Sequence, residues 1–318
     1  MANDTHAKSG MKKWVDVTER VARSRGVDHD RAAVSGLAYD VYKTRAIHQE
    51  LLQLGPVPAP LAPRATEIRA QVAAATSNLR WEQQGGLAHR AKYAPHTPQR
   101  GALRARKREQ AAEGLSSRFS LTSDVFLPGG AGSAVAEYRK LAQTTADWLT
   151  TPSASGAKVM QPGALRSGRA DHAVLYSNLI RDQGVLTHTA QQLSQQMGAT
   201  ASAHTPLGME NIAPGVAYAE FARTQRVSPM PGISITHPAP GYGQTGAESS
   251  SFGMNRAHII SGAIQQYREL GRKTDVAGRR SALGSALSSS IHAHGYDTIN
   301  PARVRASVVA THDYRRGL

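Results

Sequence analysis

The chain has 318 residues, carries 38 Lys and Arg against 23 Asp and Glu, and contains no cysteine. Without cysteine the protein forms no disulfide and no cysteine-ligated zinc or iron–sulfur site. The sequence contains no run of 18 apolar residues, which a membrane-spanning helix would need, and residues 1–10 lack the apolar core of a signal peptide. We therefore expect a cytoplasmic or virion protein, with export by a non-classical route as the alternative.

Large apolar side chains are scarce. Ala contributes 50 residues, whereas Leu, Ile, Val and Phe together contribute 57, which is about 18% of the chain. Helices rich in Ala bury little area each, at roughly 25 cal/mol per Å² of apolar surface. The composition therefore predicts a helical protein with a thin core, whose burial is completed by self-association or by a larger assembly.

The net charge of +15 comes entirely from the two ends of the sequence. Residues 1–120 hold 20 basic and 11 acidic side chains (net +9), residues 251–318 hold 10 and 4 (net +6), and residues 121–250 hold 8 of each. This division predicts a basic N-terminal helical region at 1–120, a neutral helical middle with long loops at 121–250 and a basic C-terminal three-helix module at 251–318. Such a basic excess is typical of contact with an anionic polymer, DNA or RNA, or with an acidic protein surface.

Helical periodicity dominates the apolar pattern along the chain. The clearest breaks are the Pro- and Gly-rich stretches 55–60, 151–169 and 228–253. Between the breaks we predict helices at about 14–25, 30–54, 62–84, 133–149, 171–197, 215–226, 255–271, 275–292 and 302–312. Only residues 233–235 alternate like a strand. The predicted fold class is mainly α: Ala-rich helical bundles joined by long Pro/Gly loops, with little or no β structure.

Basic side chains that could contact nucleic acid fall into two groups. The densest cluster contains five cations in nine residues, a spacing suited to following phosphates, and consists of Arg100, Arg104, Arg106, Lys107 and Arg108. The second group lies in the C-terminal module and consists of Arg279, Arg280, Arg303 and Arg305. Three short capped helices with a basic last helix could dock in a DNA groove, although they also describe an ordinary small bundle.

One short stretch could carry catalysis. Asn255, Arg256 and His258 follow the long loop and begin a predicted helix. A histidine beside an amide and a guanidinium could act as a general base on water near a bound phosphate, with Arg256 stabilising the phosphate. His258 can equally flank the apolar face of its helix and have no chemical role. The stretch therefore supports a nuclease-like C-terminal domain only as an alternative.

Four side chains near the C-terminus are weak candidates for a metal site: His292, His294, Asp297 and His312. Imidazoles and a carboxylate are good ligands for zinc. However, no HExxH or comparable spacing occurs, and histidines at helix ends also complement the helix dipole. We therefore predict no metal and no cofactor.

The sequence also lacks a P-loop, a GxGxxG after a strand and a GxSxG elbow. We therefore favour a protein that is not an enzyme: a basic helical binding or assembly protein, either nucleic-acid-associated or a structural component of a virion. The alternative is a transported effector or toxin with a nuclease-like C-terminal domain. An adaptor that docks on an acidic protein would share the same charge pattern.

Overall fold

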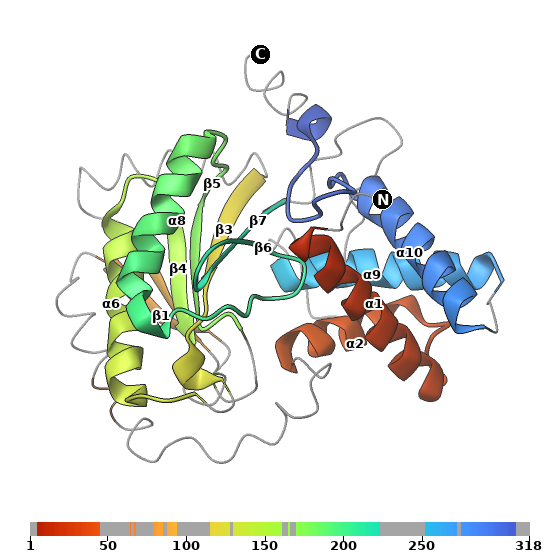
Figure 1. The fold of residues 1–318 in the computed structure, drawn as a ribbon, viewed down its shortest axis with the longest axis horizontal. Helices are drawn as coiled ribbons and strands as arrows, with labels where there is room; N and C mark the ends of the chain where they lie inside the picture. The colour runs from red at the N-terminus through yellow and green to blue at the C-terminus, as the bar shows by residue number, and fades with distance from the viewer. Residues whose placement is uncertain are drawn as a thin grey trace.

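A seven-stranded sheet forms the middle layer of the molecule (Figure 1). The computed structural model describes residues 5–44, 64, 67, 79–84, 88–93, 115–127, 130–160, 165, 170–222, 252–271 and 275–309. All neighbouring strands pair antiparallel, in the order β1-β2-β4-β5-β3-β7-β6. Their bounds are β1 Leu79–Gln84, β2 Ala88–Tyr93, β3 Leu115–Leu121, β4 Ala154–Met160, β5 Ala173–Asn178, β6 Glu210–Ala213 and β7 Val216–Ala222.

This sheet shows that the predicted fold class, with little or no β structure, is wrong. Strand β4 lies in the predicted Pro/Gly connector. Strand β5 lies in the first part of the range 171–197, which was predicted as one helix, and β7 lies in the range 215–226, which was also predicted as a helix. The reason is that helices cover both faces of the sheet, so its strands lack the alternation of polar and apolar residues that marks a half-exposed strand. Strand β3, for example, has the sequence LSSRFSL and is buried along its whole length.

Two helices cover one face of the sheet: α6 (Ala134–Thr150) and α8 (Gln183–Met197). Both begin at a side-chain cap, because Ser133 accepts a hydrogen bond from the backbone of Ala136 and Asp182 accepts one from Val185. Their buried side chains and those of the central strands form one hydrophobic core, which contains Phe119, Trp148 and Tyr218 among others.

Four helices cover the other face: α1 (His6–Ser24), α2 (Arg31–Thr44), α9 (Phe252–Glu269) and α10 (Val276–Ala293). They form the second hydrophobic core, in which Trp14 of α1 is fully buried and stacks on Tyr42 of α2 at 5.2 Å between ring centroids. This core joins residues 7–42 to residues 252–308. The division of the chain into three regions by charge remains a prediction, but its two basic ends fold against each other.

The start of α1 is fastened to distant parts of the chain. Thr5 caps α1, and its hydroxyl donates a 2.8 Å hydrogen bond to the carbonyl of Ile299. His6 contacts the hydroxyl of Thr205. The first and last helices of the layer therefore lie side by side. Among the described residues, no helix is long and apolar enough to span a membrane.

Candidate anion-binding pocket between α1 and α10

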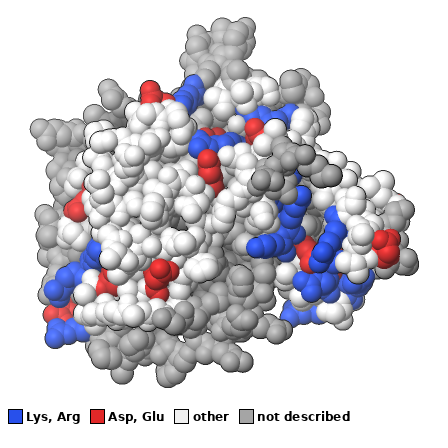
Figure 2. All heavy atoms as spheres, in the orientation of Figure 1, with Lys and Arg blue, Asp and Glu red and all other residues white. Residues whose placement is uncertain are grey.

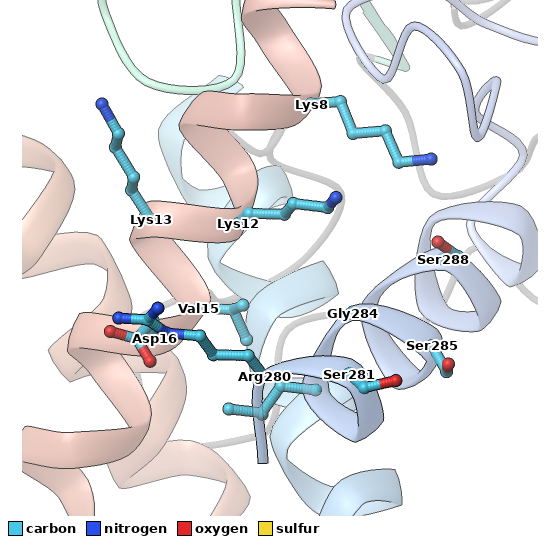
Figure 3. A pocket seen from close by; sticks show the side chains of 11 residues that line it. Lys8, Lys12, Lys13, Val15, Asp16, Arg280, Ser281, Gly284, Ser285 and Ser288 are labelled. Atoms are coloured by element: carbon cyan, nitrogen blue, oxygen red, sulfur yellow. The ribbon is translucent and has the colours of Figure 1, made fainter. Parts of the chain in front are cut away.

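A pocket of about 890 Å³ lies between α1 and α10 (Figure 3). Lys8 and Lys12 extend from α1 across the gap toward α10, and Arg280 extends from α10 toward α1. The complete lining is Lys8, Lys12, Lys13, Val15, Asp16, Arg280, Ser281, Leu283, Gly284, Ser285 and Ser288. The lining thus contains four cations and one carboxylate, although Lys13 points away from α10, and the pocket lies between a helix of the basic N-terminal region and a helix of the basic C-terminal region.

Helical spacing explains why these side chains share the pocket. Lys8, Lys12 and Asp16 are four residues apart and therefore lie on one face of α1. On α10, Ser281, Ser285 and Ser288 follow with spacings of four and three. The facing side chains on α10 are small, so the two helices leave an open space above their contact.

The floor and one end of the pocket hold the helices together. Val15 and Leu283 are each 2% exposed and belong to the core below the pocket. At the end, Arg279 donates to Asp16 at 2.6 Å and to Glu19 at 2.9 Å. Asp16 also pairs with Arg20 at 3.1 Å. The only carboxylate in the lining is therefore already engaged by two arginines that are not part of the lining.

The surface view agrees with this charge distribution. Figure 2 shows Lys and Arg side chains gathered over the layer of α1 and α10, while the visible face of the sheet and α8 layers carries few charges of either sign. Lys12, Lys13 and Arg280 are exposed. The pocket can therefore attract an anion from solution, because its excess positive charge is open to solvent.

A second set of charges lies buried between the sheet and the helices. Arg118 on β3 is 2% exposed and donates to Asp171 at 2.9 Å and to the hydroxyl of Tyr42 at 3.1 Å. Its guanidinium also lies over the ring of Phe252, 4.8 Å from the centroid. These contacts connect β3, the start of β5, α2 and α9, so this group holds the two layers together.

The structure brings two of the three predicted catalytic residues together. Arg256 is fully buried and donates to Asn255 at 2.8 Å, and to the carbonyls of Glu220 at 3.0 Å and Pro301 at 2.8 Å. Its guanidinium lies 3.7 Å from the ring centroid of Tyr296. Burial lowers the pKa of Arg256. These contacts occupy Arg256 with the protein itself and fasten the 300–304 segment to α9.

His258 faces a different environment. Its Nδ1 lies 3.0 Å from the hydroxyl of Ser35, and its side chain is buried between α9 and α2. Burial lowers the pKa of His258 to about 4, with smaller contributions from the charges of His294 and Arg31. The imidazole is therefore neutral at pH 7. Its nuclease role remains a prediction without support from this geometry, since its contact is with Ser35 and not with a cleft.

The predicted nucleic-acid contacts are divided by the structure. The cluster Arg100, Arg104, Arg106, Lys107 and Arg108 lies outside the described residues. Arg303 pairs with Glu210 at 2.7 Å and Glu220 at 3.3 Å, and Arg305 contacts His292 at 2.9 Å.

Of the basic residues in the C-terminal module, Arg280 lines the pocket, whereas Arg279 is engaged by carboxylates. Sequence reasoning missed Lys8, Lys12 and the α10 serines, although the four-residue spacing of the two lysines was a readable signal.

The weak metal candidates do not form a site among the described residues, where no three His, Cys, Asp or Glu side chains converge. His294 Nδ1 lies 2.7 Å from the carbonyl of Ser290, and Asp297 accepts hydrogen bonds from two backbone amides in the turn that follows α10. His312 lies outside the described residues.

A smaller pocket of about 370 Å³ lies beside Glu220 and Arg303. Burial raises the pKa of Glu220, whose carboxylate accepts from Tyr218 at 3.2 Å and from the backbone of Val304 at 2.8 Å. Its charges are paired within the protein, so we regard this pocket as a weaker candidate than the one between α1 and α10.

Comparison with known proteins adds an independent line of evidence. The model of the HopA1 effector protein family matches residues 154–303, which is slightly under half of the chain. This range includes α10 but not α1. A search of curated proteins finds no match.

Two solved structures share the fold of almost the whole chain. One is the effector protein from Pseudomonas syringae pv. syringae strain 61, with 19% identity, a TM-score of 0.57 and coverage of 96% of this chain and 100% of that chain. The other is the effector protein from Pseudomonas syringae pv. tomato strain DC3000, with 17% identity, a TM-score of 0.52 and coverage of 94% and 99%. At these identities the likeness establishes the fold.

The comparisons favour one of the functions predicted from the sequence over the others. They support the transported effector that was given as the alternative, and they provide no support for a virion component, a nucleic-acid-binding protein or a nuclease. Residues 154–303 are therefore similar in sequence to the HopA1 effector protein family, and the fold is similar to that of two Pseudomonas syringae effector proteins.

Proposed function

We propose that this protein is an effector that is delivered into a host cell and acts there by binding an anionic ligand in the pocket between α1 and α10. The observation that carries the proposal is the lining of the pocket, which contains a single carboxylate and four cations, Lys8, Lys12, Lys13 and Arg280. The match to the HopA1 family model and the two effector structures support delivery.

The pocket is a better candidate for this activity than the buried polar layer, by which we mean Arg118, Arg256 and their hydrogen-bond partners between the sheet and the helices. Arg118 and Arg256 are each enclosed by contacts within the chain, so an external ligand would have to displace them. Lys12, Lys13 and Arg280 are exposed, and Asp16 is engaged by Arg279 and Arg20. An incoming anion therefore meets an excess of positive charge without breaking the fold.

Delivery is tested with a reporter enzyme that is active only in host cytosol. The full chain, fused to the reporter, is expressed in a bacterium with and without a working effector-secretion apparatus. We expect reporter signal in host cells only when the apparatus works. Equal signal from both strains, or none from either while the fusion is present in the bacteria, contradicts delivery.

The role of the pocket in this activity is tested by reversing the charges of two of its cations and measuring the host response. Lys12→Glu combined with Arg280→Glu should abolish the host response that the wild-type protein causes, while reporter delivery continues. A matched control, Arg25→Glu with Arg139→Glu, makes the same change in net charge at exposed positions that are not in the lining. If both double variants retain the response, the pocket does not carry the function.

A further inference from the structure

The size of the pocket restricts its ligand. At about 890 Å³ it falls within the range of roughly 300–1,000 Å³ that is typical of small-molecule sites. A nucleic-acid duplex, by contrast, requires an extended surface rather than a hollow between two helices. The inference that follows rests on the proposed function, because it identifies the ligand class of the same pocket.

The charges of the lining indicate an anion with more than one negative group. Lys8 and Lys12 extend across the gap one helical turn apart, and Arg280 reaches in from the opposite helix. Lysines act as mobile point charges toward phosphate, and arginine adds a planar fork of donors. Cations from two sides, separated by a helical turn, suit an anion that carries two or more phosphates.

The wall formed by α10 supplies neutral donors and room. Ser281, Ser285 and Ser288 belong to the lining, and the hydroxyl of Ser288 points into the gap in Figure 3. Serine hydroxyls donate hydrogen bonds to phosphate oxygens. Below them, the buried side chains of Val15 and Leu283 provide an apolar floor for the carbon skeleton of a ligand.

Gly284 leaves one point of the α10 wall without a side chain. It occupies the interior of α10, where glycine destabilises a helix relative to alanine. A Cβ added at this position meets nothing within 4 Å, so no neighbouring atom of the described protein excludes a side chain there. A side chain at 284 would instead occupy the pocket. The glycine therefore leaves the helix backbone open to whatever fills the space.

We infer that the pocket between α1 and α10 binds a small molecule carrying two or more phosphate groups. The phosphates contact Lys8, Lys12 and Arg280, and the carbon skeleton lies against α10 at Gly284. An inositol polyphosphate and a nucleoside triphosphate share this chemistry, and the experiment separates them.

The test is isothermal titration calorimetry on the full chain at 50 mM and 150 mM NaCl. The probes are inositol hexakisphosphate, ATP in EDTA, inorganic phosphate and a 20-base-pair DNA duplex. We expect at least one of the first two probes to bind at least tenfold more tightly than inorganic phosphate. Which of them binds more tightly identifies the source of the phosphates. A duplex that binds more tightly than both small probes overturns the inference, as does the absence of binding by both.

Two kinds of variant locate the binding. Lys12→Glu with Arg280→Glu should weaken the preferred probe at least tenfold, while the control Arg25→Glu with Arg139→Glu changes its affinity less than threefold. Gly284→Leu leaves the charge unchanged and should also weaken binding at least tenfold by filling the space. Ser288→Leu serves the same purpose if Gly284→Leu does not fold, as judged by circular dichroism. Equal losses in both charge variants, with none in either leucine variant, would overturn the pocket as the site.

The two proposals fail separately. A chain that is delivered into host cells but binds none of the phosphorylated probes remains an effector and contradicts only the ligand class. A chain that binds a probe in the pocket but is never delivered contradicts the effector role and leaves the binding site intact.

Discussion

The buried polar layer and the α1–α10 pocket use the same kinds of side chain in opposite ways. In the layer, Arg118 and Arg256 are enclosed by partners from several elements: Arg118 pairs with the carboxylate of Asp171, and Arg256 donates to backbone carbonyls. In the pocket, Lys12 and Arg280 are exposed, and the single carboxylate of the lining is engaged elsewhere. The contrast shows that a basic composition alone does not locate a binding site. Arg280 lines an open pocket, whereas Arg118 and Arg256 are enclosed by the protein.

The strongest test of this comparison removes the carboxylate that compensates Arg118. Asp171→Ala leaves a buried guanidinium without its ion-pair partner, and we expect a loss of about 3–5 kcal/mol in the free energy of unfolding. Urea denaturation measures it. Asp147→Ala, at an exposed position of α6, is the control and should cost less than about 1 kcal/mol. Similar losses in the two variants would remove the distinction between buried and exposed charge.

A second test uses the dependence of stability on pH, which reports on another buried group, His258 of α9. The pKa of its imidazole is about 4 in the folded protein and 6.5 as the reference value, so the unfolded chain binds more protons between these values. The contribution of neutral His258 to the free energy of unfolding is therefore fully present above pH 6.5. On the order of 3 kcal/mol of it is lost as the pH falls to 4. His294, whose pKa burial also lowers, acts in the same direction.

Denaturation midpoints measured from pH 7.5 to pH 4 report this loss. The variant His258→Asn should show a shallower dependence on pH, because it removes one of the two titrating groups. A wild-type protein whose stability does not change over this range would contradict a neutral, buried His258.

A substitution in the pocket should raise the free energy of unfolding, whereas Asp171→Ala should lower it. Gly284→Ala should stabilise the fold by about 0.5–1 kcal/mol, because alanine is the better helix former and its Cβ enters open space. Thermal denaturation measures the gain. The control is Gly262→Ala on α9, where an added Cβ meets the hydroxyl of Ser290 at 2.9 Å and should destabilise. A destabilised Gly284→Ala would show that the space is needed by the protein itself.

The smallest expected effect on stability comes from the pocket's cations. Lys12→Ala and Arg280→Ala should each change the free energy of unfolding by less than about 0.5 kcal/mol, since both side chains are exposed. Chemical denaturation of the two single variants beside Asp171→Ala completes the comparison. A loss above about 2 kcal/mol in either would mean that the pocket's charges hold the fold together.

The sequence predicted the helices far better than the sheet. Helix α6 begins one residue after its Ser133 cap, and α10 begins directly after Asp275, as capping signals suggest. Strand β4, with the sequence ASGAKVM, contains Gly and Ser and resembles a connector. It pairs with β5, which lies 14–23 residues later in the sequence, and with β2, which lies 66–72 residues earlier. A local sequence pattern cannot reveal such pairing.

For the candidate site, the charge asymmetry drew attention to both ends of the chain, but it did not indicate which residues line the pocket. Arg303 looked equivalent to Arg280 in sequence, yet Glu210 and Glu220 engage Arg303 whereas Arg280 lines the pocket. That difference arises only when α1 and α10 meet in the folded protein. The position of Gly284 in the pocket lining likewise could not be predicted from the sequence, because it depends on the open space beside α10 in the folded protein.

The fastening of Thr5 to Ile299 has a consequence for how the protein matures. Because α1 completes its burial against segments near the opposite terminus, a chain that crosses a membrane end first cannot assemble this layer until nearly all of it has emerged. Until α9 and α10 are available, α1 lacks its packing partners and Trp14 remains exposed. If the chain is delivered as proposed, the pocket between α1 and α10 therefore forms last, and a truncated chain that lacks α10 also lacks the pocket.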